Sequence, residues 1–153
     1  TTEIYTLSLH DALPISIDRK ALLEGDEDSA IAPLEERLSN LDSPSLESFE
    51  EHLAQCLNAL DGSVYADESG ESGDSDDGFL YARCFVVAQG RNQFEATLKN
   101  PQLMPKTLDG WCEALLYPHR NAWARLTGRD ASEWEFDSSV SYESGSNEDL
   151  WPR

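Results

Sequence analysis

The sequence predicts an all-α domain of about five helices packed around a buried helix near residues 76–89, with an extended C-terminal tail. Two observations predict this fold class. Apolar residues recur at helical spacing in several segments that are bounded by proline or glycine, the residues that commonly start and stop helices. The chain has 153 residues, 39% of them hydrophobic, which is enough for one domain with its own core.

The N-terminal segment, residues 1–16, is expected to be an adapter-derived artefact that is not native. Residue by residue, it matches the conceptual translation of a common sequencing-library adapter. We therefore leave it out of the fold, as is appropriate for a segment of foreign origin. The remaining chain is expected to consist of a helical domain, residues 17–129, and a tail, residues 130–153, that packs on this domain.

The clearest helix is expected between Ser43 and Gly62. Ser43 suits the N-cap, Pro44 suits the first helical position, and Gly62 suits the end. The stripe that would face the core comprises Leu46, Phe49, Leu53, Cys56, Leu57 and Leu60. The opposite, exposed face carries Glu47, Glu50 and Glu51.

The segment 62–78 is acidic, contains glycines and has almost no apolar residue, so we expect an exposed, mobile loop. The buried helix near 76–89 follows it. Side-chain acceptors that suit a helix N-terminus stand at its start, namely Asp74, Ser75, Asp76 and Asp77. Residues 79–88 are apolar on nearly all sides and also permit a strand, but the acceptors favour a helix.

Weaker helical patterns occupy five other segments, at 17–23, 33–38, 91–100, 107–117 and 119–127. Pro101 stops the third of these, Thr107 caps the fourth, and Gly128 suits the C-terminus of the last. In the tail, apolar residues occur in period-two pairs, which favours an extended segment that could include a short strand. These residues are Trp134, Phe136, Val140 and Tyr142.

Charge and composition exclude several classes of partner. The chain has 30 Asp and Glu against 11 Lys and Arg, a formal net charge of -19. Proteins bind phosphate backbones through Lys and Arg, so nucleic acid is not an expected partner. A membrane span needs a run of about 18 apolar residues, which is missing. The three cysteines are widely spaced and odd in number, which indicates reduced thiols in the cytoplasm.

Part of the sequence resembles the Domain of Unknown Function 4240 family of bacterial proteins, from Leu34 to about Gly128. The residues that carry the resemblance are Ser75-Asp76-Asp77-Gly78-Phe79, Arg83, Val87, Gln89-Gly90, Phe94, Leu98 and Asn100-Pro101. They form a Ser-Asp-Asp cap, a helix with an arginine, and a Gln-Gly junction. The resemblance implies a mostly helical bacterial cytosolic domain without an established activity.

The candidate site residues of the buried helix are Asp76, Asp77 and Arg83, which we expect to form an ion-pair cluster at its start. A metal site is the alternative, because the carboxylates of Asp74, Asp76 and Asp77 could converge on a hard cation. The register of an EF-hand fails, since that motif would need glycine where Asp77 stands and glutamate where Arg83 stands. His52 and Cys56 have the spacing of zinc ligands but lack a Cys-x-x-Cys pair beside them. We expect no cofactor.

The leading functional hypothesis is a non-enzymatic, acidic, cytosolic protein-interaction or regulatory domain. Its partner would be another protein, met by the surface of Glu47, Glu50 and Glu51. One specific form is an inhibitor or immunity-like protein that masks a basic surface. The alternative is a metal-dependent enzyme that uses Asp74, Asp76 and Asp77.

Overall fold

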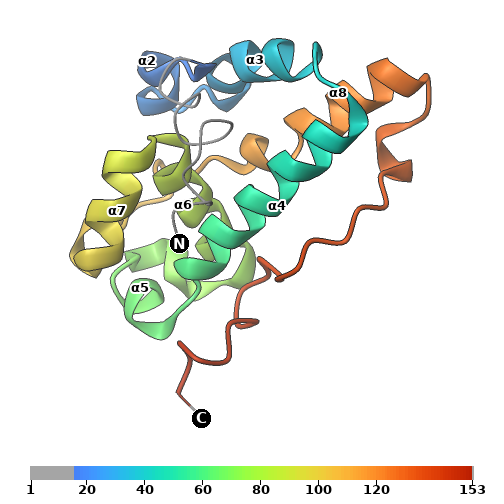
Figure 1. Ribbon diagram of the computed structural model, residues 1–153. Helices are drawn as coiled ribbons and strands as arrows, with labels where there is room; N and C mark the ends of the chain where they lie inside the picture. The colour runs from blue at the N-terminus through green and yellow to red at the C-terminus, as the bar shows by residue number, and fades with distance from the viewer. Residues whose placement is uncertain (1–15, 153) are drawn as a thin grey trace.

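The computed structural model describes residues 16–152, and it confirms the all-α fold class. The segment predicted to be an adapter artefact lies, apart from Ser16, outside the described residues. Residues 16–152 contain seven α-helices and four 3-10 helices and no strand (Figure 1). The α-helices are α2 (Arg19–Leu23), α3 (Glu27–Leu38), α4 (Ser43–Ala59), α5 (Ser63–Asp67), α6 (Asp76–Ala88), α7 (Arg91–Lys99) and α8 (Pro118–Thr127). The 3-10 helices are η2 (Gly70–Asp74), η3 (Pro101–Leu103), η4 (Glu113–Leu116) and η5 (Ala131–Glu133).

Helix α6 lies at the centre of the core, as the sequence predicts, and the alternative of a strand is wrong. Most of its residues are buried, and α4, α7, η2 and η4 pack against it. Ser75 is the N-cap, and its Oγ accepts a hydrogen bond of 3.0 Å from the backbone N–H of Gly78. Asp76 and Asp77 occupy the first turn, where negative charge stabilises the helix dipole.

Helix α4 carries the predicted apolar stripe, which packs on α6 and α8. Its N-cap is Asp42 and not Ser43, because the Asp42 carboxylate accepts from the N–H of Ser45. The predicted exposed face needs a correction at Glu50, which is only 4% exposed because α8 and the start of the tail cover it. Glu47 and Glu51 are half-buried.

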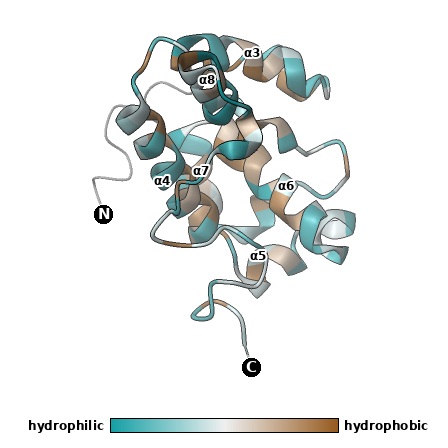
Figure 2. Ribbon diagram, turned by 90° about the vertical axis from the view of Figure 1, so that its right-hand side faces the viewer, coloured by the Kyte–Doolittle hydropathy of each residue, from teal (hydrophilic) through white to brown (hydrophobic). Residues whose placement is uncertain are grey.

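Helices α3 and α8 pack on each other at one end of the molecule. Helix α3 begins well before Pro33, because Asp26 caps it by accepting from the N–H of Ser29. Helix α8 ends at Gly128 in the left-handed conformation, as predicted. Brown and teal residues alternate along the helices in Figure 2, as expected for helices that bury one face.

Two segments differ from the sequence-based expectation. Residues 62–78 form α5 and η2 instead of an exposed loop, with Tyr65, Ser69 and Ser72 buried. The segment predicted as a helix from Thr107 is irregular until η4, because its contacts are long-range: the N–H of Cys112 donates to the carbonyl of Tyr81 in α6.

The tail forms no strand within the described residues, and it is not extended throughout, because turns occupy residues 144–145 and 148–150. Figure 1 shows it leaving α8 through η5 and running beside α4 toward the opposite end of the molecule. Trp134, Tyr142 and Trp151 are half-buried and pack against the core. Among residues 16–152, no helix combines the length and the apolar content needed to cross a membrane.

Candidate functional site

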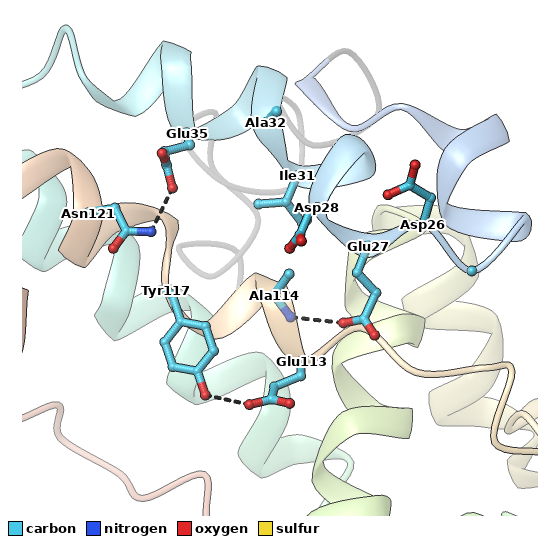
Figure 3. Close-up of a pocket in the computed structure, with 11 residues that line it drawn as sticks. Asp26, Glu27, Asp28, Ile31, Ala32, Glu35, Glu113, Ala114, Tyr117 and Asn121 are labelled. Atoms are coloured by element: carbon cyan, nitrogen blue, oxygen red, sulfur yellow. Dashed lines mark hydrogen bonds between the residues drawn. The ribbon is translucent and has the colours of Figure 1, made fainter.

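A cavity with a volume of about 680 Å³ and an acidic wall lies on the described chain (Figure 3). It lies between the turn before α3, the exposed side of α3, η4 and the first turn of α8. Five carboxylic residues line it, and none of the described lining residues is basic. The carboxylic residues are Asp26, Glu27, Asp28, Glu35 and Glu113.

Local folding explains how three of these carboxylates come to stand together. Asp26 caps α3, and the hydrogen bonds from Ser29 lower the pKa of its carboxyl group. Glu27 and Asp28 occupy the first turn, where the helix dipole favours negative charge. The end of α3 that meets the cavity is therefore acidic for reasons of helix stability.

Glu35 lies further along α3 and pairs with Arg125 over 2.6 Å, and Glu113 begins η4; hydrogen bonds also hold both carboxylates. Asn121 of α8 donates to Glu35 over 2.8 Å, and Tyr117 donates to Glu113 over 2.8 Å (Figure 3). The carboxylate of Glu27 accepts from the backbone N–H of Ala114 over 3.0 Å, which ties η4 to α3. These hydrogen bonds tie the walls of the cavity to one another, and the chemistry of the cavity suits a positively charged group.

A second polar cluster is buried under the start of the tail, around Glu50 of α4. Its Oε1 accepts from His119 Nε2 over 2.8 Å, from Arg120 Nη2 over 3.2 Å and from Trp134 Nε1 over 3.1 Å. Arg120 Nη2 also donates to the hydroxyl of Tyr142 over 3.2 Å. A cavity of about 280 Å³ lies between Glu50, Arg120 and tail residues that include Tyr142.

Burial and pairing set the protonation of this cluster. Burial opposes ionisation of Glu50, but the hydrogen bonds from His119 and Trp134 and the charge of Arg120 outweigh it and lower its pKa. Burial also lowers the pKa of His119 despite the neighbouring carboxylate of Glu50, so His119 is neutral at pH 7. The cluster is a carboxylate held by a neutral imidazole, a guanidinium and an indole.

Arg83 is fully buried, but the predicted ion-pair cluster with Asp76 and Asp77 does not form among the described residues. Its Nη1 donates to the carbonyl of Leu57 over 2.9 Å, and its Nη2 to Ser144 Oγ of the tail over 2.9 Å. Burial lowers its pKa, and the nearby charge of Asp61 opposes this effect. Asp76 contributes only its backbone carbonyl, to Ser144, and both aspartates are exposed because they serve the helix start.

The family model for the protein of unknown function (DUF4240) matches residues 16–137. The chain belongs to the DUF4240 family. No curated protein and no solved structure matches it. The match includes the acidic cavity, Glu50 and Arg83, whereas Ser144 and the tail residues around it lie beyond the matched range.

The predicted metal candidates of this DUF4240 domain are not brought together. Asp74, Asp76 and Asp77 are all exposed. Within residues 16–152, no three or more His, Cys, Asp or Glu side chains lie close enough together to hold a metal ion. His52 and Cys56 are therefore not part of such a group either.

The cysteines of the DUF4240 domain are buried thiols that form no disulfide within the described residues. Burial raises the pKa of Cys56 and Cys112 to about 12, and it raises the pKa of Cys84 well above its usual value. Because the thiolate is the nucleophile, these side chains are suited to packing.

Sequence reasoning missed the acidic cavity, Asp61 and the partners of Glu50. The signal for the cavity was present in the run Asp26-Glu27-Asp28, which is typical of a helix start. No local signal links Glu50 to His119 and Trp134, which follow 69 and 84 residues later in the chain.

Proposed function

We propose that this DUF4240 protein is an interaction or regulatory domain that binds a basic segment of another protein in the acidic cavity. The observation that carries the proposal is the cavity of about 680 Å³ with five carboxylic residues and no basic residue in its described lining. A net charge of -19 adds a long-range attraction for such a partner.

The acidic cavity replaces the surface that the sequence suggested. Glu50 is buried and paired, and Glu51 accepts hydrogen bonds from Ser139 of the tail, so neither is free to meet a partner. In the acidic cavity, Asp28 is exposed and Glu113 is half-buried, within reach of an incoming Lys or Arg. An inhibitor or immunity-like protein that masks a basic surface is one form of this function.

The test is the binding of a short peptide rich in Lys and Arg, measured by calorimetry. The double variant Asp28→Asn, Glu113→Gln removes two charges from the acidic cavity. Exposed ion pairs contribute about 0.2–1 kcal/mol each, so we expect binding to weaken by about 2- to 30-fold. Binding should also weaken as salt increases from about 20 to about 300 mM, because the charges are screened.

The matched control is Asp67→Asn, Asp74→Asn, which makes the same change in net charge at two exposed residues outside the acidic cavity. Equal weakening by both double variants would show that overall charge, and not the acidic cavity, attracts the peptide.

The hypothesis of a metal-dependent enzyme at Asp74, Asp76 and Asp77 gains no support from the positions of these residues, and we do not propose it.

A further inference from the structure

The C-terminal strap, residues 137–152, has no buried residue of its own but covers buried charges of the helical domain. Asp61, just after α4, and Arg83 of α6 are both 0% exposed. Since burial of a charge is unfavourable without hydrogen bonds or an opposite charge, the partners that the strap supplies are essential to this arrangement.

The strap satisfies the Asp61 carboxylate with four donors. Oδ1 accepts from the N–H of Gly145 and from the indole N–H of Trp151, each over 2.9 Å. Oδ2 accepts from the N–H of Asn147 over 2.9 Å and from the hydroxyl of Ser146 over 3.4 Å. The two backbone donors come from a turn: Gly145 has a φ of +90°, the N–H of Ser146 donates to the carbonyl of Glu143, and a second turn closes from Leu150 to Asn147.

Further contacts continue this recognition along α4 and α6. Arg83 donates to the hydroxyl of Ser144, which donates to the carbonyl of Asp76 over 2.7 Å. The side-chain amide of Asn58 in α4 donates to the backbone carbonyl of Ser141 over 3.0 Å. The backbone carbonyl of Asn58 accepts from the side-chain amide of Asn147 over 2.9 Å. The helical domain therefore presents a polar groove, defined by Asn58, Asp61 and Arg83, that recognises a segment with a turn at Gly145.

The closed arrangement leaves polar atoms without partners, which favours release of the strap. Arg83 Nε and Arg120 Nε are buried without a hydrogen-bond partner in the described structure. Ser144 covers the first guanidinium and Tyr142 contacts the second. Departure of the strap would let water reach these donors, so part of the cost of opening is offset. An ordered strap without buried residues also gives up conformational entropy on closing.

We propose that the polar groove is a binding site for a peptide segment of a partner that forms the same turn, and that the chain's own strap occupies it and is exchanged for that segment. The partner segment would supply a hydroxyl for Arg83, and two peptide N–H groups two residues apart and an indole N–H for Asp61. The groove lies within the part of the chain that matches the DUF4240 family, and its present occupant follows that part. The proposal does not depend on the acidic cavity.

Hydrogen exchange of the full chain tests this proposal, with a synthetic peptide of residues 141–152 as the probe. Without peptide, the amides of Gly145 and Asn147 should exchange at least about tenfold faster than the slowest amides of α6, because the strap opens without global unfolding. A tethered segment has an effective concentration on the order of millimolar. Peptide at about 1 mM should therefore displace the strap in about half of the molecules and abolish its protection there.

The control peptide carries Gly145→Pro. Proline lacks the N–H that donates to Asp61 and cannot adopt the φ of +90° found at Gly145. It should leave strap exchange unchanged. In the full chain, Asp61→Asn should accelerate exchange at Gly145 and Asn147 by about tenfold or more, whereas Asp149→Asn at an exposed strap position should not.

Three results would overturn the proposal. The amides of Gly145 and Asn147 could exchange as slowly as the slowest amides of α6, which would mean that the strap opens only when the domain unfolds. The 141–152 peptide could leave strap exchange unchanged at millimolar concentration. The proline-containing peptide could accelerate exchange as much as the matching peptide. The experiments with the two peptides use the unaltered chain, so their results test the proposal even if Asp61→Asn fails to fold.

Discussion

Replacement of Glu50 by alanine is expected to destabilise the protein strongly, although periodicity places this residue on an exposed helix face. The side chain of Glu50 is 5% exposed and its Oε1 accepts three hydrogen bonds. Removal of one member of a buried charge pair costs about 3–5 kcal/mol. Arg120 is 31% exposed and retains some hydration, so we expect a loss near the lower end, about 3 kcal/mol.

The assay is thermal and urea unfolding followed by circular dichroism. A loss of 1 kcal/mol lowers Tm by about 2–4 °C in a domain of this size, so Glu50→Ala should lower Tm by about 6–12 °C. The Tm of Glu50→Gln should lie between that of Glu50→Ala and that of the unaltered protein, because glutamine keeps an acceptor oxygen but loses the charge. The matched control is Glu47→Ala, one turn earlier on α4 and half-buried, with an expected change below about 0.5 kcal/mol.

Equal melting temperatures of Glu50→Ala and Glu47→Ala, within about 2 °C, would refute the reasoning. That result would mean that water or movement of the tail compensates His119 and Arg120 after the carboxylate is lost. A drop that Glu50→Gln restores completely would instead assign the stabilisation to hydrogen bonding alone.

Three further predictions concern other parts of the protein. Burial lowers the pKa of His119, so below its ordinary value of 6.5 the unfolded chain binds a proton that the folded chain does not. The free energy of unfolding should therefore fall as pH decreases from about 7 to about 5, by up to about 1.4 kcal/mol per pH unit more than in the variant His119→Gln. Equal pH dependence of the two proteins would contradict this assignment. Ser75→Ala removes the N-cap of α6 and should cost about 1 kcal/mol in urea unfolding, while Asp74→Asn on the exposed side should change it little, and the reverse order would place the cap elsewhere. Burial raises the pKa values of the thiols of Cys56, Cys84 and Cys112, so they should resist a thiol-specific reagent at pH 8 in the folded protein and react with it in urea. Rapid labelling of the folded protein would show that the core opens at these residues.

The central part of the fold could be predicted from the sequence because its signals are local. The stripe of α4 repeats with the helical period, and Ser75 precedes the first turn of α6 at a position that accepts from Gly78. Pro101 and Gly128 act through their own backbone preferences. Such features need no knowledge of distant residues, and the structure confirms them.

The rest depends on long-range contacts that carry no local pattern. Residues 62–78 looked like a mobile loop because they contain few apolar side chains, yet Trp111 donates to Ser72 over 2.9 Å and Tyr65 to the carbonyl of Leu98 over 2.8 Å. Polar residues can be buried when distant partners satisfy them, and composition does not reveal those partners. The same reason explains why Glu50 was assigned to the surface and why Asp61 was overlooked.

The anchor points of the strap also set its minimum length. Glu51 holds Ser139 and Asp61 holds Gly145, and the ten residue steps from Glu51 to Asp61 along α4 and its end rise by about 15 Å. The six residue steps from Ser139 to Gly145 span at most about 20 Å when extended. Loss of two of them would leave about 13 Å, which is too short to bridge both anchors, whereas an insertion could bulge into solvent. Shortening should therefore be far more damaging in this segment than lengthening or changes in its exposed side chains.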